Sequence, residues 1–204
     1  MDIQVKKLDE AYSVANEINN NIKNSSIKLS DDLKRIINSL STHWRGDDAT
    51  LHINNWIDQY DEYSFYFDNI SGVFNYIQNY FVNLQTCRSA TSENTKIGDR
   101  VSNRINFEPI ARKETTAEYY YDEKVEDDYA QLTELCHEFD NFVQKVDNGL
   151  SEIYGNWLIG NGRAQIKESY DDIFMLSQNL SKQAEVLCDD LERIIGNNKT
   201  ISTP

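Results

Sequence analysis

The chain has 204 residues, of which 39% are hydrophobic and 26% are charged, and its formal net charge is −14 at pH 7. A surface of this charge repels polyphosphate, which argues against nucleic-acid binding. The sequence contains no apolar run long enough to cross a bilayer, so stable membrane insertion is not expected. Only eight Gly and two Pro are present, and this scarcity of turn residues favours long helices over sheets.

The first residues, 1–7, are amphipathic and lack the apolar segment and cleavage site of a secretory leader. We therefore expect a cytoplasmic protein, or one exported without a leader. Residues 103–204 carry 20 acidic and 10 basic side chains, against 14 and 10 in residues 1–102. The second half is the better candidate for docking a basic partner, although a solvated acidic face is the simpler interpretation.

Two apolar stripes at helical spacing predict a first helix that ends at Trp44. Between the stripes, residues 19–26 are rich in Asn and Ser, which favour helix poorly. We therefore predict a kink or break near residues 24–30, with Ser30 as a new N-cap. The stripes consist of Leu8, Ala11, Ala15, Ile18 and Ile22, and of Leu29, Leu33, Ile37, Leu40 and Trp44.

The strongest pattern begins at Ala49, where apolar residues recur at alternating steps of four and three. Only a helix places such residues on one stripe, and the period indicates packing against other helices. Gly46 provides a turn before this helix, and Asp47 is its candidate N-cap. The stripe consists of Ala49, Ile53, Trp56, Tyr60, Tyr63, Phe67, Ile70, Phe74, Ile77, Phe81 and Leu84.

Two further series of the same kind predict a third and a fourth helix. Thr115 and Glu118 have the spacing of a capping box that would open the third helix. Gly196–Asn198 is the expected end of the fourth helix. The third series consists of Val125, Tyr129, Leu132, Cys136, Phe139, Val143, Val146, Leu150, Ile153 and Trp157, and the fourth of Ile166, Tyr170, Ile173, Ser177, Leu180, Ala184, Leu187, Leu191 and Ile194.

These patterns predict an all-α protein of two long antiparallel helical hairpins, which form an elongated four-helix bundle as an intramolecular pseudo-dimer. The expected divisions are a first hairpin at 1–90, a linker at 91–115, a second hairpin at 116–196 and a frayed tail at 197–204. An extended linker of this length reaches about 80 Å, whereas a helix of about 40 residues measures about 60 Å. The linker can therefore return along a whole helix, which favours antiparallel pairing of the hairpins.

Trp44, Arg45 and Gly46 lie between two long helical patterns, and Trp157 with Gly160 follows at the corresponding place in the second half. This arrangement resembles the WXG superfamily of small type VII secretion substrates over residues 1–90. The second half, 116–196, departs from the pattern by one extra residue between Trp and Gly. The resemblance implies hairpins that dimerise antiparallel and are exported without a leader by a membrane ATPase, alone or with larger toxins.

Members of this family often carry a Tyr-xxx-Asp/Glu export signal, which is read together with the Trp-Xaa-Gly turn of the partner. Tyr119 and Glu123 have this spacing, and the resemblance implies that they lie near Trp44 and Gly46. The simpler interpretation is that Tyr119 and Glu123 are first-turn residues of the third helix. Both Trp side chains are expected to pack, whereas Arg45 is expected to be exposed and available for recognition.

No catalytic constellation is found, so we do not expect an enzyme. The histidines are scattered, and the cysteines, Cys87, Cys136 and Cys188, lack metal-ligand spacing. We expect no metal, no cofactor and three reduced thiols.

The leading hypothesis is a leaderless secreted substrate, or the escort of a larger effector, that binds the secretion ATPase or that effector. One alternative is a cytoplasmic chaperone or immunity-like protein that binds a toxin. Another is a structural coiled-coil component that self-assembles. A self-contained pseudo-dimer is expected to be monomeric, which distinguishes it from the last alternative.

Overall fold

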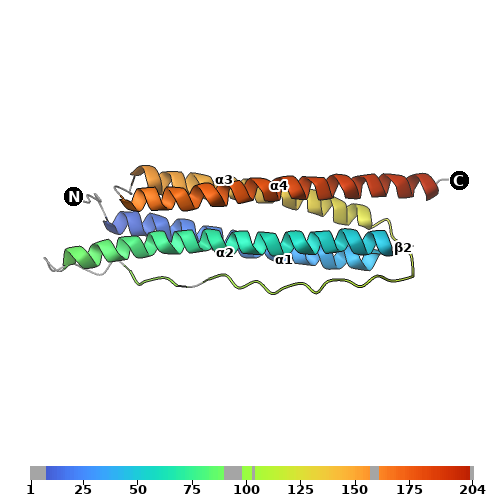
Figure 1. Ribbon diagram of the computed structural model, residues 1–204, viewed down its shortest axis with the longest axis horizontal. Coiled ribbons are helices and arrows are strands. Elements are labelled where there is room, and N and C mark those ends of the chain that lie inside the picture. Colours follow the sequence, from blue (N-terminus) through green and yellow to red (C-terminus); the bar gives the residue numbers. More distant parts are fainter. Residues whose placement is uncertain (1–7, 90–97, 103, 157–160, 203–204) are drawn as a thin grey trace. The chain divides into compact units, whose positions relative to one another are not determined.

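The computed structural model describes residues 8–89, 98–102, 104–156 and 161–202, which form four long helices and two short strands (Figure 1). The helices are α1 (Leu8–His43), α2 (Asp47–Ser89), α3 (Val125–Asn156) and α4 (Asn161–Ser202). The strands, β1 (Trp44–Arg45) and β2 (Tyr120–Tyr121), pair antiparallel. The predicted all-α class is confirmed.

Contacts divide the chain into two compact units, and each unit takes a segment from every helix. Unit 1 consists of Met1–Ser26, Tyr66–Asn106 and Phe142–Leu176, and unit 2 of Ile27–Phe65, Phe107–Asn141 and Ser177–Pro204. This division by contacts differs from a division into two hairpins along the sequence. The hairpin boundaries therefore stay a prediction.

The apolar stripe predicted for α2 is buried. Its ten members from Ala49 to Phe81 are each at most 2% exposed, and only Leu84 is half-buried. Burial of one large apolar side chain stabilises a protein by about 1.5–3 kcal/mol. The stripe is therefore a main source of stability in both units.

In unit 2, the α2 segment packs against α3 and α4. The Tyr63 and Phe139 rings stack with their centroids 4.1 Å apart. Gln59 is buried and donates from Nε2 to the carbonyl oxygen of Leu180 at 3.0 Å. A buried amide needs such a partner, because an unpaired one would lose its hydrogen bonds to water.

The α1 and α3 segments of unit 2 run antiparallel. Lys28 contacts Glu138 at 3.0 Å, and His43, further along α1, contacts Asp128, which lies earlier in α3. Residue numbers thus rise along α1 while the numbers of the contacting residues on α3 fall. The exposed Lys28 pair contributes little stability by itself, but it reports the direction of the two helices.

In unit 1, aromatic side chains of α2 pack against α3. The Phe142 ring meets the Phe67 ring edge to face, with a centroid separation of 5.2 Å, and Tyr66 lies at 6.2 Å in a similar orientation. Such edge-to-face pairs add about 0.5–1.5 kcal/mol beyond the burial of area. The same series of aromatic residues therefore serves both units.

Unit 1 also contains a polar layer between α1 and α2. The buried Asn19 donates from Nδ2 to Asn75 at 3.1 Å and to the side-chain oxygen of Gln78, which in turn donates to Asn16 at 2.9 Å. Lys23 donates to the same Asn75 oxygen at 3.0 Å. Because buried amides must find these partners, the layer fixes the register of the two helices.

The predicted break in the first helix is wrong. α1 continues through residues 24–30, and Ser30 is a buried mid-helix residue and not an N-cap. Ser26 is fully buried and its hydroxyl donates to the carbonyl oxygen of Ile22 at 2.9 Å. Burial of Ile22 and Leu29 on either side outweighs the weak helix propensity of the intervening Asn and Ser residues.

Three predicted helix ends also differ from the structure. α2 begins with Asp47, one position earlier than an N-cap at Asp47 implies, and α4 continues past Gly196 to Ser202. α3 begins at Val125, so Thr115 and Glu118 do not open it. The side chain of Asp122 caps α3 instead, because its Oδ1 accepts from the Lys124 amide at 2.9 Å.

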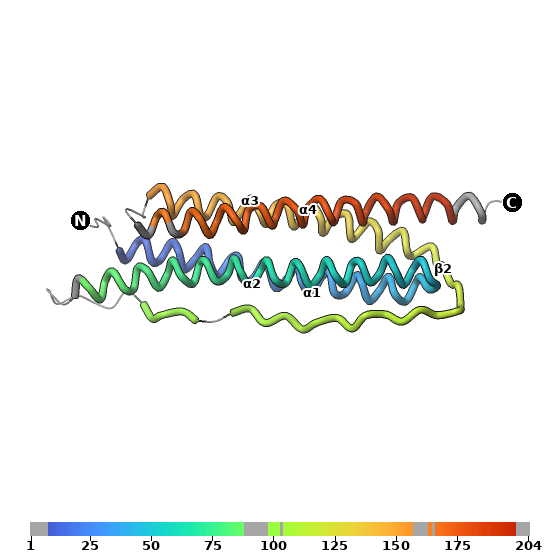
Figure 2. Tube along the Cα trace, viewed as in Figure 1, coloured from blue at the N-terminus to red at the C-terminus, as the bar shows by residue number. Residues whose placement is uncertain are grey.

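Residues 98–102 and 104–119, before α3, are extended, and within each unit they lie along α2 (Figure 2). In unit 1, the Asn79 side chain exchanges two hydrogen bonds with the backbone of Val101, at 2.7 and 2.8 Å. In unit 2, Asn54 does the same with Lys113, at 3.1 and 2.9 Å. Each Asn side chain thus supplies the one donor and the one acceptor that a neighbouring β-strand would otherwise offer to the extended backbone.

The close approach of α1 and α3 in unit 1 depends on Gly149. A Cβ at this position would lie 2.7 Å from Cγ2 of Ile18, whereas a Cβ at Gly72 in α2 would meet nothing within 4 Å. We expect Gly149→Ala to lower the free energy of unfolding by about 1–2 kcal/mol, since the added methyl overpacks the contact. The matched control, Gly72→Ala, should raise it by up to about 1 kcal/mol through helix propensity.

Urea unfolding followed by circular dichroism measures both changes. Equal stabilisation by the two substitutions would contradict the close contact between Ile18 and Gly149.

Candidate functional site

The turn between α1 and α2 requires glycine at position 46. Gly46 has φ = 123°, a conformation that side chains rarely adopt, and a Cβ there would lie 3.3 Å from Cδ2 of Tyr119. The Gly46 carbonyl oxygen accepts from both the amide and the hydroxyl of Thr50, each at 2.9 Å. Gly46 therefore both makes the turn and starts the hydrogen bonding of α2.

Trp44 is a packing residue, as predicted for it. Its side chain is buried, and its ring centroid lies 5.8 Å from that of His52. His52 accepts through Nε2 from the indole nitrogen of Trp56 at 3.1 Å. This hydrogen bond requires an unprotonated Nε2, and burial lowers the pKa of His52 to about 4, against a weaker opposing effect of Asp190.

The strand β2 joins the turn to the start of α3. Trp44 pairs with Tyr121 and Arg45 with Tyr120, and the Asp122 amide donates to the carbonyl oxygen of His43 at 2.9 Å. The Lys124 amide, and secondarily the Tyr120 hydroxyl, lowers the pKa of the Asp122 carboxyl by donating to it. The chain just before α3 is thereby fixed beside the Trp-Xaa-Gly turn.

Five side chains lie around the turn between α1 and α2, which is the first turn of the chain. We call them the first-turn surface: Arg45, Glu118, Tyr119, Tyr120 and Asn198. The Arg45 side chain is 47% exposed, and its guanidinium carbon lies 5.7 Å from the ring centroid of Tyr120, while Nη1 lies 4.0 Å from a carboxylate oxygen of Glu118. Tyr119 is 65% exposed, and its hydroxyl donates to Oδ1 of Asn198 on α4 at 2.8 Å. Exposed contacts of this kind contribute little stability, so a partner can displace them easily.

The structure thus brings part of the predicted site together. Trp44, Arg45 and Gly46 lie beside Tyr119, whereas Glu123 is exposed in the turn before α3 and its carbonyl accepts from the Glu126 amide at 3.0 Å. Tyr119 and Glu123 both precede α3, so the interpretation of them as first-turn residues of that helix is wrong. Trp157 and Gly160 lie outside the described residues.

A contact between a histidine and a buried aspartate, close to this turn, is not predicted from the sequence. Asp128 in α3 is only 2% exposed and accepts from Nδ1 of His43, at the end of α1, at 2.8 Å. The two residues are 85 positions apart, so no local pattern connects them. The pair joins the end of α1 to the start of α3 and gives the buried carboxylate its partner.

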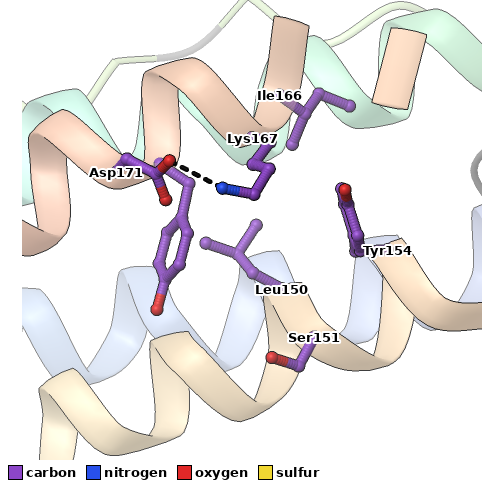
Figure 3. Close-up of a pocket in the computed structure, with 7 residues that line it drawn as sticks. Leu150, Ser151, Tyr154, Ile166, Lys167 and Asp171 are labelled. Atoms are coloured by element: carbon purple, nitrogen blue, oxygen red, sulfur yellow. Dashed lines mark hydrogen bonds and ion pairs between the residues drawn. The ribbon is translucent and has the colours of Figure 1, made fainter. Parts of the chain in front are cut away.

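A second candidate is a small cleft between α3 and α4 in unit 1 (Figure 3). It measures about 180 Å³, and its lining residues are Leu150, Ser151, Tyr154, Ile166, Lys167, Tyr170 and Asp171. Lys167 and Asp171 form an ion pair at 2.9 Å, and the Tyr170 hydroxyl bonds to Asp147. Burial, followed by this contact with Asp147, raises the pKa of Tyr170. The charged groups are thus already paired, and the cleft is small for a ligand site.

Within the described ranges, no group of three His, Cys, Asp or Glu side chains is arranged to hold a metal ion. Among the same residues, no helix is long and apolar enough to cross a membrane. Comparison with models of protein families, with curated proteins and with solved structures finds no match.

The buried His52 predicts a specific pH dependence of stability. Its pKa is about 4 in the folded protein, below the ordinary 6.5, so between these values the unfolded chain binds a proton that the folded chain does not. Stability is therefore lost as pH falls through this range. From about pH 7.5 to about pH 5, we expect the parent to lose about 1–2 kcal/mol more than His52→Gln, which keeps an acceptor for Trp56.

Urea unfolding at the two pH values measures this difference. The control is His137→Gln, because His137 is exposed on α3, and it should lose as much stability as the parent. The same loss in His52→Gln as in the parent would contradict the assignment.

Proposed function

We propose that this chain is a non-enzymatic helical protein of a type VII secretion pathway, either a leaderless secreted substrate or the escort of a larger effector. The observation that carries the proposal is the packing of Tyr119 against Gly46. Gly46 and Tyr119 belong to two segments that resemble separate parts of an export signal. They are 73 positions apart in the sequence but lie beside the same turn. Two motifs that match the family only by chance have no reason to lie this close together.

In this proposal the two hairpins pair antiparallel within one chain, as a four-helix bundle that replaces the dimer of smaller family members. Support comes from each unit separately. In unit 2, α1 and α3 run antiparallel from Lys28 and Glu138 to His43 and Asp128. In unit 1, the same two helices approach closely at Ile18 and Gly149.

The first-turn surface is suited to protein recognition. It presents two exposed Tyr rings and an exposed Arg, which are residue types enriched at protein interfaces and their hot spots. Its partner in this proposal is the secretion ATPase, the larger effector, or both. Trp44 supports the surface from beneath and does not itself contact the partner.

A second candidate is a cytoplasmic chaperone or immunity-like protein that binds a toxin. The observation that favours it is in unit 2, where Val186 on α4 is 59% exposed near the acidic side chains of Glu185, Asp189 and Asp190. Large exposed apolar residues beside acidic ones suit a basic, partly apolar partner. The two candidates differ in where the protein is found in the cell.

Export of the tagged protein by a type VII-competent host tests the leading proposal. We expect it in the medium only when the secretion ATPase is present. Arg45→Ala, Tyr119→Ala and Glu123→Ala should each reduce export at least about tenfold, as loss of an interface hot spot does. These side chains are exposed, so the variants should keep the thermal midpoint of the parent within about 3 °C.

Glu168→Ala is the matched control, because Glu168 is an exposed Glu on α4 away from the two motifs in sequence, and it should be exported like the parent. Retention of the parent in the cytoplasm with an active ATPase would overturn the proposal and favour the second candidate. Trp44→Ala is less informative, since loss of this buried ring also destabilises the fold.

Mass in solution distinguishes this proposal from a self-assembling structural protein. A chain that contains its own pseudo-dimer leaves no aromatic stripe of α2 for a second copy, so we expect a monomer of 23.7 kDa at micromolar concentrations. Sedimentation equilibrium measures this mass. Concentration-dependent growth into larger species would support the structural alternative.

A further inference from the structure

Two of the three cysteines lie next to each other in unit 2. The Sγ atoms of Cys136 on α3 and Cys188 on α4 are 3.7 Å apart, although the residues are separated by 52 positions. Both are free thiols in the structure. A disulfide has a sulfur–sulfur distance of about 2.05 Å. Its formation therefore requires the sulfurs to approach by less than about 2 Å, a movement within the reach of small side-chain rotations.

The neighbourhood holds these two thiols in place. The hydroxyl of Ser181 on α4 donates to Asp140 on α3 at 2.7 Å, one turn of α3 beyond Cys136. The stacked rings of Tyr63 and Phe139 fill the core beside the thiols. The thiols thus share one layer of a packed α3–α4 contact and cannot separate without disrupting it.

We propose that Cys136 and Cys188 are a covalent modification site, at which a low-molecular-weight disulfide converts the two thiols into an intramolecular disulfide that joins α3 to α4. One protein thiolate attacks a sulfur of the small disulfide, whose sulfur–sulfur bond breaks and releases one small thiolate. The second protein sulfur then attacks the resulting mixed disulfide, forms the Cys136–Cys188 bond and releases the second small thiolate. Both protein thiol protons end on the two small thiols, so the protein loses two electrons and the small disulfide gains them.

The two cysteines differ in their exposure and in the direction in which the pKa of the thiol is shifted. Cys136 is half-buried and offers a route for the reagent, whereas Cys188 is only 7% exposed. The hydrogen bond between the thiols raises the pKa of Cys136 and lowers that of Cys188. Cys87 is exposed on α2 and serves as an internal reference for simple reagent access.

The new bond would close a loop of 52 positions. A loop of this length restricts the unfolded chain considerably, so the disulfide should stabilise the fold as long as its geometry is unstrained. This inference does not depend on the proposed function.

The test incubates the Cys87→Ala variant of the full chain with oxidised glutathione as the probe. Unreacted thiols are then alkylated under denaturing conditions, and linked peptides are identified by mass spectrometry. We expect a peptide pair joined through Cys136 and Cys188, with a yield independent of protein concentration. Cys136→Ala and Cys188→Ala, each combined with Cys87→Ala, should give no intramolecular link.

A second measurement compares thermal midpoints. The linked form of Cys87→Ala should melt roughly 5–15 °C above its reduced form, and addition of a reducing agent should restore the lower value. The inference is overturned if Cys136 and Cys188 do not react, and are therefore both found alkylated, at oxidised glutathione concentrations that fully modify Cys87 in the parent. Glutathione adducts without a link, or a lower midpoint of the linked form, would also overturn it.

Discussion

Ten apolar side chains recur along α2 at alternating steps of four and three residues, and each is at most 2% exposed. Six of the ten are aromatic, and an aromatic side chain buries about 150–250 Å². A helix can hide such a stripe only by packing against other elements, so the stripe dictates what lies beside it. In unit 2 it packs against Phe139 of α3, and in unit 1 against Phe142. The side chains of Asn54 and Asn79 then bind the extended segment.

The helices and their buried residues could be predicted from the sequence where the buried positions follow the helical period. The stripe of α2 could be predicted residue by residue because nearly every position at that period is apolar. The path of α1 could not, because the weak propensity of its Asn and Ser residues suggested a break that tertiary packing prevents. The start of α3 at Val125 depends on the cap by Asp122, and Thr115 with Glu118 offered a motif of the same kind at the wrong place.

Contacts between distant positions were the part of the site that the sequence could not provide. The spacing from Glu123 points to Tyr119 in the sequence, but the contact of Tyr119 with Gly46 depends on the antiparallel pairing of β1 with β2. The His43–Asp128 pair and the Cys136–Cys188 pair are 85 and 52 positions apart and have no local signature. Such pairs are determined by the register between helices, which a single sequence does not specify.

The tripeptide at residues 44–46 has a physical explanation that is independent of export. Trp44 fills the core, Gly46 adopts a positive φ beneath the Tyr119 ring, and only Arg45 between them is exposed. These reasons for a Trp and a Gly at the turn apply to a helical hairpin of any function. In the proposed function, recognition would therefore be carried by side chains that the fold does not need, and Arg45 and Glu123 meet this condition better than Trp44.

The two units differ in what fills their interiors. Unit 1 has the amide layer around Asn19, where each buried polar group depends on a partner, and such layers give specific register more than stability. Unit 2 has the stacked Tyr63 and Phe139 rings beside the thiol pair, and it also contains the first-turn surface. Unit 2 buries polar groups as well, among them His52, Gln59 and Asp128, so the interior of each unit combines apolar packing with polar side chains that need a partner.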